Sequence, residues 1–143
     1  MHVVILGCGR VGAQLANMLD AEGHDVTVID RNNDQFRRLD ADFGGTAIVG
    51  TGIDQDILRR AGIERADFFI AVTNGDNTNV MAAQIAKHVF HVPHAITRIY
   101  DPVREETYRN LGLETYCPTT LGTAKIRELM GKHEPTASGR PAR

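Results

Sequence analysis

The chain has 143 residues, enough for one domain with a buried core, and its 42% apolar and 24% charged residues are ordinary for a globular protein. Its 16 basic and 18 acidic residues give a net charge of −2, which argues against a nucleic acid or an anionic membrane surface as the main partner. Two cysteines are too few for a disulfide framework, and the first residues lack the basic start and long apolar run of a signal peptide. We therefore expect a cytoplasmic protein without a membrane span.

Short apolar runs alternate with helical patterns along the chain. The predicted strands cover residues 3–6, 26–29, 47–49, 68–72, 95–99 and 115–116. The predicted helices cover residues 11–21, 33–41, 54–61, 76–89 and 102–110, and a last one, capped by Thr119 or Thr120, runs to about residue 130. Several strands are apolar throughout, which is typical of parallel strands covered on both faces. The alternation predicts an α/β fold of the Rossmann type, a doubly wound parallel sheet of six strands in the order 3-2-1-4-5-6.

The C-terminal residues differ in composition from the rest of the chain. Residues 132–143 are rich in proline, glycine, serine and charge, which predicts a flexible tail or linker. We expect residues 1–131 to form one nucleotide-binding domain.

The first strand leads into a glycine-rich loop at residues 7–12, with the sequence Gly-Cys-Gly-Arg-Val-Gly. In this pattern Gly7 permits a tight turn, Gly9 lets backbone N–H groups approach a pyrophosphate, and Gly12 lets the next helix pack close to the strand. The helix N-terminus then offers free amides and a positive dipole end to the phosphates. Asp30 ends the second strand, where its carboxylate can accept hydrogen bonds from ribose hydroxyls. The combination predicts a nucleotide site.

Asp30 also discriminates between nucleotides, because a carboxylate repels a 2′-phosphate and so favours NAD or another adenine nucleotide over NADP. The neighbouring Arg31 leaves NADP open, since an arginine can accept a 2′-phosphate. Ligands of this fold lie outside the carboxyl ends of the strands, so the loops there should line one crevice. The candidate binding residues are Gly7, Cys8, Gly9, Arg10, Val11, Gly12, Asp30, Arg31, Thr51, Gly52, Thr73, Asn74, Asn79 and Arg98.

Several polar residues allow more than one interpretation. Arg10 pairs with phosphate oxygens, in its own site or in a neighbour's across a dimer interface, or it is a solvated side chain. Arg98 interrupts an apolar strand, which favours a phosphate or a buried carboxylate as partner, with a structural salt bridge as the alternative. Asp76 and Asn79 could instead cap and start the long helix. Cys8 is expected to be a small apolar filler.

The chain lacks the groups that a dehydrogenase places beside a nicotinamide, since no Tyr-x-x-x-Lys pair occurs. His88, His91 and His94 recur every third residue but straddle a helix end and a proline turn, so no metal site is expected. We therefore predict a non-enzymatic protein for which the nucleotide is a signal. The alternatives are an NAD-dependent oxidoreductase fragment lacking its substrate domain, and a nucleotide-free interaction scaffold.

A wider set of segments, together with the glycine loop, matches a known family. These segments are residues 23–26 leading into 29–30, residues 58–67 and 70–73, Asn79 with residues 81–83, Arg98 with Asp101, residues 111–113 and Pro118. With them the chain, over about residues 1–130, resembles the TrkA-N or RCK N-terminal domain. This is the nucleotide-binding regulatory subunit of bacterial Trk and Ktr potassium uptake systems and related potassium channels.

The resemblance implies a domain that binds NAD(H), ADP or ATP and forms a homodimer or a higher ring. It implies as partner a membrane-embedded potassium transporter or channel subunit, gated from the cytoplasmic face as nucleotide exchange changes the angle between paired domains. It also implies that Arg10 lies near the phosphates, that Thr73 and Asn79 mark the edge of the fourth strand and the start of the following helix, and that Arg98 faces the phosphates.

The chain departs from the family pattern in three places. Residues 50–53 read Gly-Thr-Gly-Ile where the family often has Gly-Asp-Ala-Thr, which bears on contacts on the adenine side. Pro118-Thr119 stands where Pro-Glu often supplies an acid to a cation site at the dimer interface, so no metal is expected there. Many members continue into a second C-terminal lobe, so we expect either a short stand-alone form or an excised domain. An apolar stripe on the last helix would serve a dimer or pack on its own sheet; it comprises Leu121, Ile126, Leu129 and Met130.

Overall fold

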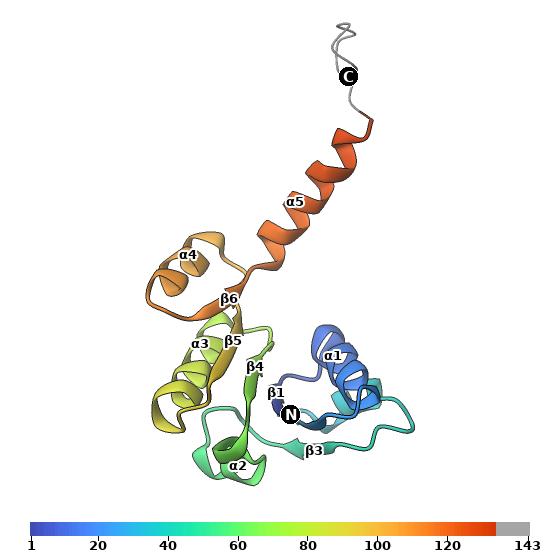
Figure 1. Cartoon of the computed structure of the whole chain (residues 1–143), viewed down its shortest axis with the longest axis vertical. Coiled ribbons are helices and arrows are strands. Elements are labelled where there is room, and N and C mark those ends of the chain that lie inside the picture. The colour runs from blue at the N-terminus through green and yellow to red at the C-terminus, as the bar shows by residue number, and fades with distance from the viewer. Residues whose placement is uncertain (134–143) are drawn as a thin grey trace, which may run out of the picture.

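The computed structural model describes residues 1–133 and shows a parallel six-stranded sheet with helices on both faces (Figure 1). Its strands are β1 (His2–Leu6), β2 (Asp25–Asp30), β3 (Thr46–Val49), β4 (Phe68–Ala71), β5 (His94–Arg98) and β6 (Glu114–Tyr116). They lie in the order β3-β2-β1-β4-β5-β6, and every neighbouring pair is parallel. The predicted fold class and strand order are confirmed. Most of the predicted tail, residues 134–143, lies outside the described residues.

The helical segments follow the predicted alternation. They are α1 (Arg10–Ala21), the 3₁₀ turns η1 (Asn33–Arg38) and η2 (Ile63–Arg65), α2 (Gln55–Arg60), α3 (Asp76–Gln84), its π-helical continuation η3 (Ile85–Val89), α4 (Pro102–Asn110) and α5 (Pro118–Gly131). The predicted long helix over residues 76–89 is therefore α3 with η3. Most other predicted bounds agree within one residue, and two predictions are wrong.

The predicted helix over residues 33–41 is a 3₁₀ segment that ends at Arg38. Leu39 is already extended, with φ −72° and ψ 143°. The Asn17 side chain of α1 explains this end, because it donates to the Arg38 carbonyl at 3.2 Å and accepts from the Asp40 amide at 2.9 Å. Tertiary hydrogen bonds thus replace the next helical turn.

The last helix begins earlier than predicted. Pro118 occupies its first turn and Cys117 its N-cap position, without a side-chain capping bond. Proline is well suited to this position because its missing N–H would have no helical partner there. Neither Thr119 nor Thr120 is the cap; the Thr119 hydroxyl instead donates to the Tyr100 carbonyl at 2.9 Å.

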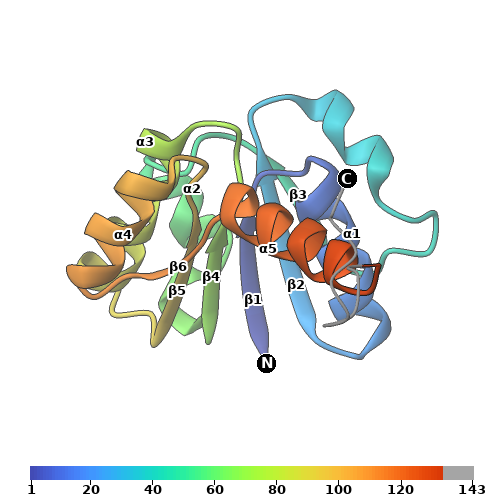
Figure 2. The same ribbon diagram turned by 90° about the horizontal axis from the view of Figure 1, so that it is seen from above.

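The core consists of two layers, one on each face of the sheet. On one face Ala13 and Ala16 of α1 pack with Val3 and Ile5 of β1, and on the other face α2 and α3 pack over the alternate β1 residues. Residues 3–6 are at most 2% exposed, so β1 is buried on both sides, as its unbroken apolar sequence predicts. Figure 2 shows α1 at the β1–β2 half of the sheet, with α3 and α4 at the β4–β6 half.

The amino-terminal edge of the sheet is fixed by His2, which is 6% exposed. Its Nδ1 lies 2.9 Å from Asp25 Oδ2, and its Nε2 lies 2.9 Å from the Ala61 carbonyl oxygen. Its backbone N–H donates to Asp67 Oδ2 at 2.8 Å. These contacts join β1 to the start of β2 and to the segment before β4, at the edge opposite to the predicted site.

Helix α5 extends away from the sheet and the other helices (Figure 1). It has 14 residues and none is buried. Its four large apolar residues are between 46% and 61% exposed: Leu121, Ile126, Leu129 and Met130. Packing of this stripe on its own sheet, one of the two alternatives, is therefore wrong. None of the helices in residues 1–133 combines the length and apolar character of a membrane span.

Candidate functional site

A crevice of about 620 Å³ lies at the carboxyl ends of β1, β2 and β4, where the strand order reverses. Open α/β sheets bind ligands at this switch point. The lining residues are Leu6, Gly7, Gly9, Asp30, Arg31, Asn32, Gln35, Thr51, Gly52, Ile53, Val72, Thr73, Asn74, Gly75 and Thr78. The volume is in the range of sites for small molecules and cofactors, about 300–1,000 Å³.

The three glycines of the first loop have different roles in the structure. Gly7 has φ 105°, a left-handed conformation, and a Cβ there would lie 2.8 Å from the Val72 carbonyl oxygen. A Cβ on Gly12 would lie 1.8 Å from the Gly7 carbonyl oxygen. A Cβ on Gly9, in contrast, would meet nothing within 4 Å, and Gly9 lines the crevice. Gly7 and Gly12 therefore serve backbone packing, whereas Gly9 keeps the crevice open beside α1.

The N-terminus of α1 is available to an anion. Gly9 is its N-cap and provides no side-chain acceptor, and the first turn contains no acidic residue. The first amides of a helix have no intrahelical acceptor, and the macrodipole places partial positive charge there. An anionic group in the crevice therefore meets free donors that no capping side chain of α1 occupies.

Asp30 is fixed in the crevice by two backbone amides. Its Oδ2 accepts from the Cys8 N–H and its Oδ1 from the Asn32 N–H, both at 2.8 Å. Because each carboxylate oxygen can accept a further bond, Asp30 retains acceptor capacity toward the crevice. The bond to Cys8 also ties the end of β2 to the glycine loop, so the predicted ribose acid and the predicted phosphate loop form one unit.

Cys8 belongs to this loop, but its side chain is fully buried and does not line the crevice. Burial, assisted by the neighbouring Asp30 carboxylate, raises the pKa of the Cys8 thiol to about 11. The thiol is therefore protonated at neutral pH, and its role is the expected one of a small apolar filler.

The loop after β4 is organised from behind by Asn79, which is fully buried in α3. Its Oδ1 accepts from the Thr73 N–H at 2.9 Å and from the Thr73 hydroxyl at 2.6 Å. Its Nδ2 donates to the carbonyls of Thr73 and Arg98, each at 3.0 Å. Asn79 is therefore neither a helix cap nor a lining residue; it holds Thr73 in the crevice wall.

Arg98 is 6% exposed and bonds to backbone instead of to a carboxylate. Its Nη2 donates to the Val72 carbonyl at 2.7 Å and to the Thr73 carbonyl at 3.0 Å, and its guanidinium lies 4.8 Å from the centre of the Tyr100 ring. The predicted buried carboxylate, and the alternative of a structural salt bridge, are both wrong. The positive charge lies beneath two residues of the crevice wall.

The remaining predicted residues divide into two groups. Arg31, Thr51, Gly52 and Asn74 line the crevice, as predicted. Arg10 and Val11 lie outside its lining, and Arg10 borders a separate hollow of about 430 Å³ over α1 and η1. Ile53 and Gly75 line the crevice within the strand-end loops that the sequence predicted there. The lining residues that the sequence did not predict flank these loops, and their position at or just after a strand end was the available signal; these are Leu6, Asn32, Gln35, Val72 and Thr78. Within residues 1–133, no cluster of histidine, cysteine and carboxylate side chains could hold a metal ion.

Comparison with known proteins gives a consistent result. The family model of the TrkA-N domain matches residues 3–117. A Trk system potassium uptake protein TrkA from Streptomyces coelicolor is 54% identical over 115 residues, which are 80% of this chain and 52% of that protein. A TrkA homolog from Pyrococcus abyssi is 37% identical over 111 residues, 78% of this chain and 49% of that protein. The chain thus spans about half the length of these relatives.

Solved structures with less than 25% identity share the fold. The TrkA-N domain of the inner membrane protein ybaL from Escherichia coli has a TM-score of 0.77 at 22% identity, covering 90% of this chain and 95% of that one. GsuK bound to ADP has a TM-score of 0.77 at 23% identity, over 93% of this chain and 34% of that one. The GsuK channel bound to NAD has a TM-score of 0.68 at 23% identity, over 82% and 21%.

Proposed function

Because the chain belongs to the TrkA-N domain family, we propose that it is a non-enzymatic regulatory domain of a potassium transport system. In this proposal it binds NAD(H) or ADP/ATP in the crevice at the carboxyl ends of β1, β2 and β4. Occupancy changes the geometry of a homodimer or ring on the cytoplasmic face of a membrane-embedded transporter or channel subunit. The relatives named as potassium uptake proteins, and the GsuK structures with NAD and ADP, support this assignment.

One observation carries the nucleotide assignment: the bond between Asp30 Oδ2 and the Cys8 N–H, which joins the ribose acid to the phosphate loop at 2.8 Å. The uncapped N-terminus of α1 suits the phosphates, and the remaining acceptor capacity of Asp30 suits the ribose hydroxyls. In this pose the predicted contacts of Thr51, Gly52, Thr73 and Asn74 are with the rest of the nucleotide.

The regulatory assignment rests on the chemistry of the crevice. Among its described lining residues, the ionisable side chains are Asp30 and Arg31. Asp30 is engaged by two amides, and no lining residue is a histidine, a lysine or a tyrosine. A hydride-transfer enzyme needs a proton donor or acceptor beside the nicotinamide, so these residues favour a signalling role over an oxidoreductase.

The proposed dimer surface is the apolar stripe of α5. By population-shift logic, a nucleotide regulates only if it binds two dimer geometries with different affinity. Light scattering with and without the best ligand tests the assembly, and a monomer under both conditions would contradict it.

Calorimetry with NAD, NADH, ADP, ATP and NADP tests the site itself. Gly9→Asp should abolish binding, because the new carboxylate repels phosphate at the α1 N-terminus while its Cβ meets no atom within 4 Å. Ala41→Asp is the control for an added charge, since Ala41 is exposed, lines neither hollow and lies away from α5. Equal affinity in the two variants would refute the assigned site.

A further inference from the structure

Tyr100 lies between the crevice and α5 and contacts the elements that form both. Its backbone N–H donates to Asp76 Oδ1 at 2.9 Å. Its carbonyl accepts from the Thr119 hydroxyl at 2.9 Å and from the Cys117 thiol at 3.4 Å, at the start of α5. Asp76 is the first residue of α3 and directly follows Gly75, which lines the crevice. One residue therefore joins the loop after β4 to the N-terminal end of α5, which we call its root.

The Tyr100 side chain forms a second connection to the crevice wall. Its ring lies beneath the Arg98 guanidinium, 4.8 Å from ring centre to Cζ. The same guanidinium donates to the carbonyls of Val72 and Thr73, which both line the crevice. Tyr100 is thus tied to the crevice through its backbone and through its ring.

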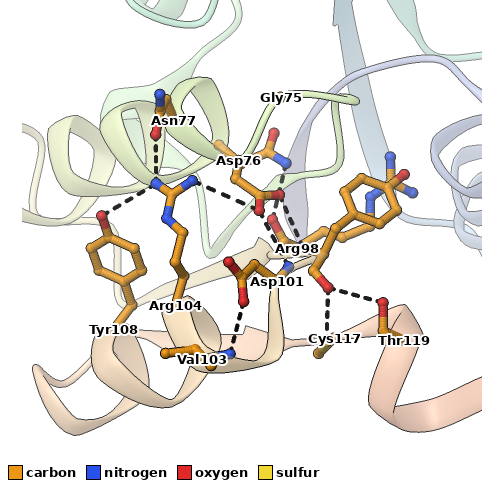
Figure 3. Close-up of polar contacts among 12 residues, drawn as sticks. Gly75, Asp76, Asn77, Arg98, Asp101, Val103, Arg104, Tyr108, Cys117 and Thr119 are labelled. Atoms are coloured by element: carbon orange, nitrogen blue, oxygen red, sulfur yellow. Dashed lines mark hydrogen bonds and ion pairs between the residues drawn. The ribbon is translucent and has the colours of Figure 1, made fainter. Parts of the chain in front are cut away.

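Asp76 is suited to transmit a displacement of the loop. Its side chain is 12% exposed, and its Oδ2 accepts from the Asp101 N–H at 3.4 Å and lies 3.9 Å from Arg104 Nη1. Figure 3 shows Arg104 reaching from α4 toward Asp76, Asn77 and Tyr108. The bond from the Tyr100 amide to Asp76 Oδ1, at 2.9 Å, is directional, so a shift of Asp76 is expected to move the Tyr100 peptide with it.

We infer that Asp76 and Tyr100 are positioning residues that couple occupancy of the crevice to the orientation of α5. The inference rests on the proposed function and names the connection that the proposed regulation uses. A nucleotide that contacts Thr73 to Gly75 displaces Asp76, and the Tyr100 peptide carries this displacement to Thr119. Because no residue of α5 is buried, contacts at its root set its direction.

Two substitutions on the same helix test the coupling. Thr119→Val removes the hydroxyl that donates to Tyr100, whereas Thr123→Val removes a hydroxyl that bonds at 2.8 Å to the Thr119 carbonyl within α5. Both residues are exposed and neither lines the crevice. Coupling between two sites is reciprocal, so loss of the bond at the root must alter nucleotide affinity. Thr119→Val should change the Kd for NAD or ADP by about two- to tenfold, the equivalent of one hydrogen bond. Thr123→Val should leave it within twofold.

Asp76→Ala removes both oxygens that accept from the Tyr100 and Asp101 amides, and so breaks this connection. In that background, Thr119→Val should have no further effect on the Kd, whereas independent, additive effects would overturn the inference. Asp67→Ala is the matched control, because its carboxylate likewise accepts from a backbone amide, that of His2 at 2.8 Å, but at the opposite edge of the sheet. Backbone hydrogen exchange over residues 117–123 provides a second test. Nucleotide should change the exchange rates there in the wild type and not in Thr119→Val, a difference that would not arise if Thr119 only stabilised the fold.

The outcomes separate the inference from the proposed function. If the wild type binds none of NAD, NADH, ADP and ATP, the proposed function fails and the inference fails with it. If the wild type binds but Thr119→Val and Thr123→Val have equal Kd values and equal ligand-dependent exchange, only the inference fails.

Discussion

Replacement of Gly9 or Gly12 by alanine should separate binding from stability within one loop. The same methyl group meets no atom within 4 Å at Gly9 but lies 1.8 Å from the Gly7 carbonyl oxygen at Gly12. Gly7 has little room to move away, because the space beside its Cα is closed by the Val72 carbonyl, whose oxygen a Cβ at Gly7 would approach to 2.8 Å. Gly9→Ala should therefore lose affinity and keep the fold, and Gly12→Ala should lose stability.

The magnitudes follow from opposing contributions. Overpacking typically lowers the free energy of unfolding by about 1–3 kcal/mol. Because the contact at Gly12 is with backbone, we expect a cost of about 3 kcal/mol for Gly12→Ala. Alanine inside a helix recovers about 1 kcal/mol relative to glycine, which leaves a net loss of about 2 kcal/mol. For a chain of this length that loss lowers Tm by about 6–10 °C. Gly9→Ala should leave stability unchanged or raise it by up to about 1 kcal/mol.

Urea denaturation and nucleotide calorimetry on both variants measure the two effects. A methyl group on Gly9 keeps a phosphate from the α1 amides, and hydrogen bonds to a charged group contribute about 1.5–3 kcal/mol, so affinity should fall about 10- to 100-fold. The reasoning is refuted if Gly12→Ala unfolds at the wild-type urea concentration. It is equally refuted if Gly9→Ala binds nucleotide as the wild type does.

Three further predictions concern single side chains. Stability should fall by about 2 kcal/mol between pH 9 and pH 11 in urea titrations, because the pKa of Cys8 is raised from 9.0 to about 11 in the fold and the thiolate forms first in unfolded chains. Cys8→Ala should remove this contribution. His2→Ala should destabilise by about 2 kcal/mol through two lost hydrogen bonds, with unchanged nucleotide affinity. Asp30→Ala should abolish nucleotide binding in calorimetry with the fold retained, and wild-type affinity would disprove its ribose role.

The sequence predicted the elements whose determinants are local or strongly periodic. The strand order followed from the alternation of apolar runs with helices that end at glycine. The position of Asp30 followed from the apolar run of β2, because Asp30 stands directly after it. The end of η1 was not predictable, because the Asn17 side chain that sets it lies on a different helix.

Hydrogen-bond partners that lie far apart in the sequence could not be predicted either. Arg98 was recognisable as a charge that needs a partner, but its acceptors are the carbonyls of Val72 and Thr73, just after β4, and backbone carbonyls occur at every position of any sequence. Threonine is a common helix cap, yet the Thr119 hydroxyl donates to the Tyr100 carbonyl, which is 19 positions earlier in the chain. The residue types indicated that these side chains form polar contacts. Only the three-dimensional arrangement identified their partners.

The exposed helix α5 also has a geometric consequence. At 1.5 Å per residue its 14 residues form a rod about 21 Å long that is attached at one end. A tilt of about 10° at Cys117 therefore moves its far end by about 3.5 Å, several times the displacement at the root. In the proposed coupling, the helix would act as a lever arm: a movement in the crevice too small to rearrange the sheet would become, at Met130, a displacement on the scale of a side chain.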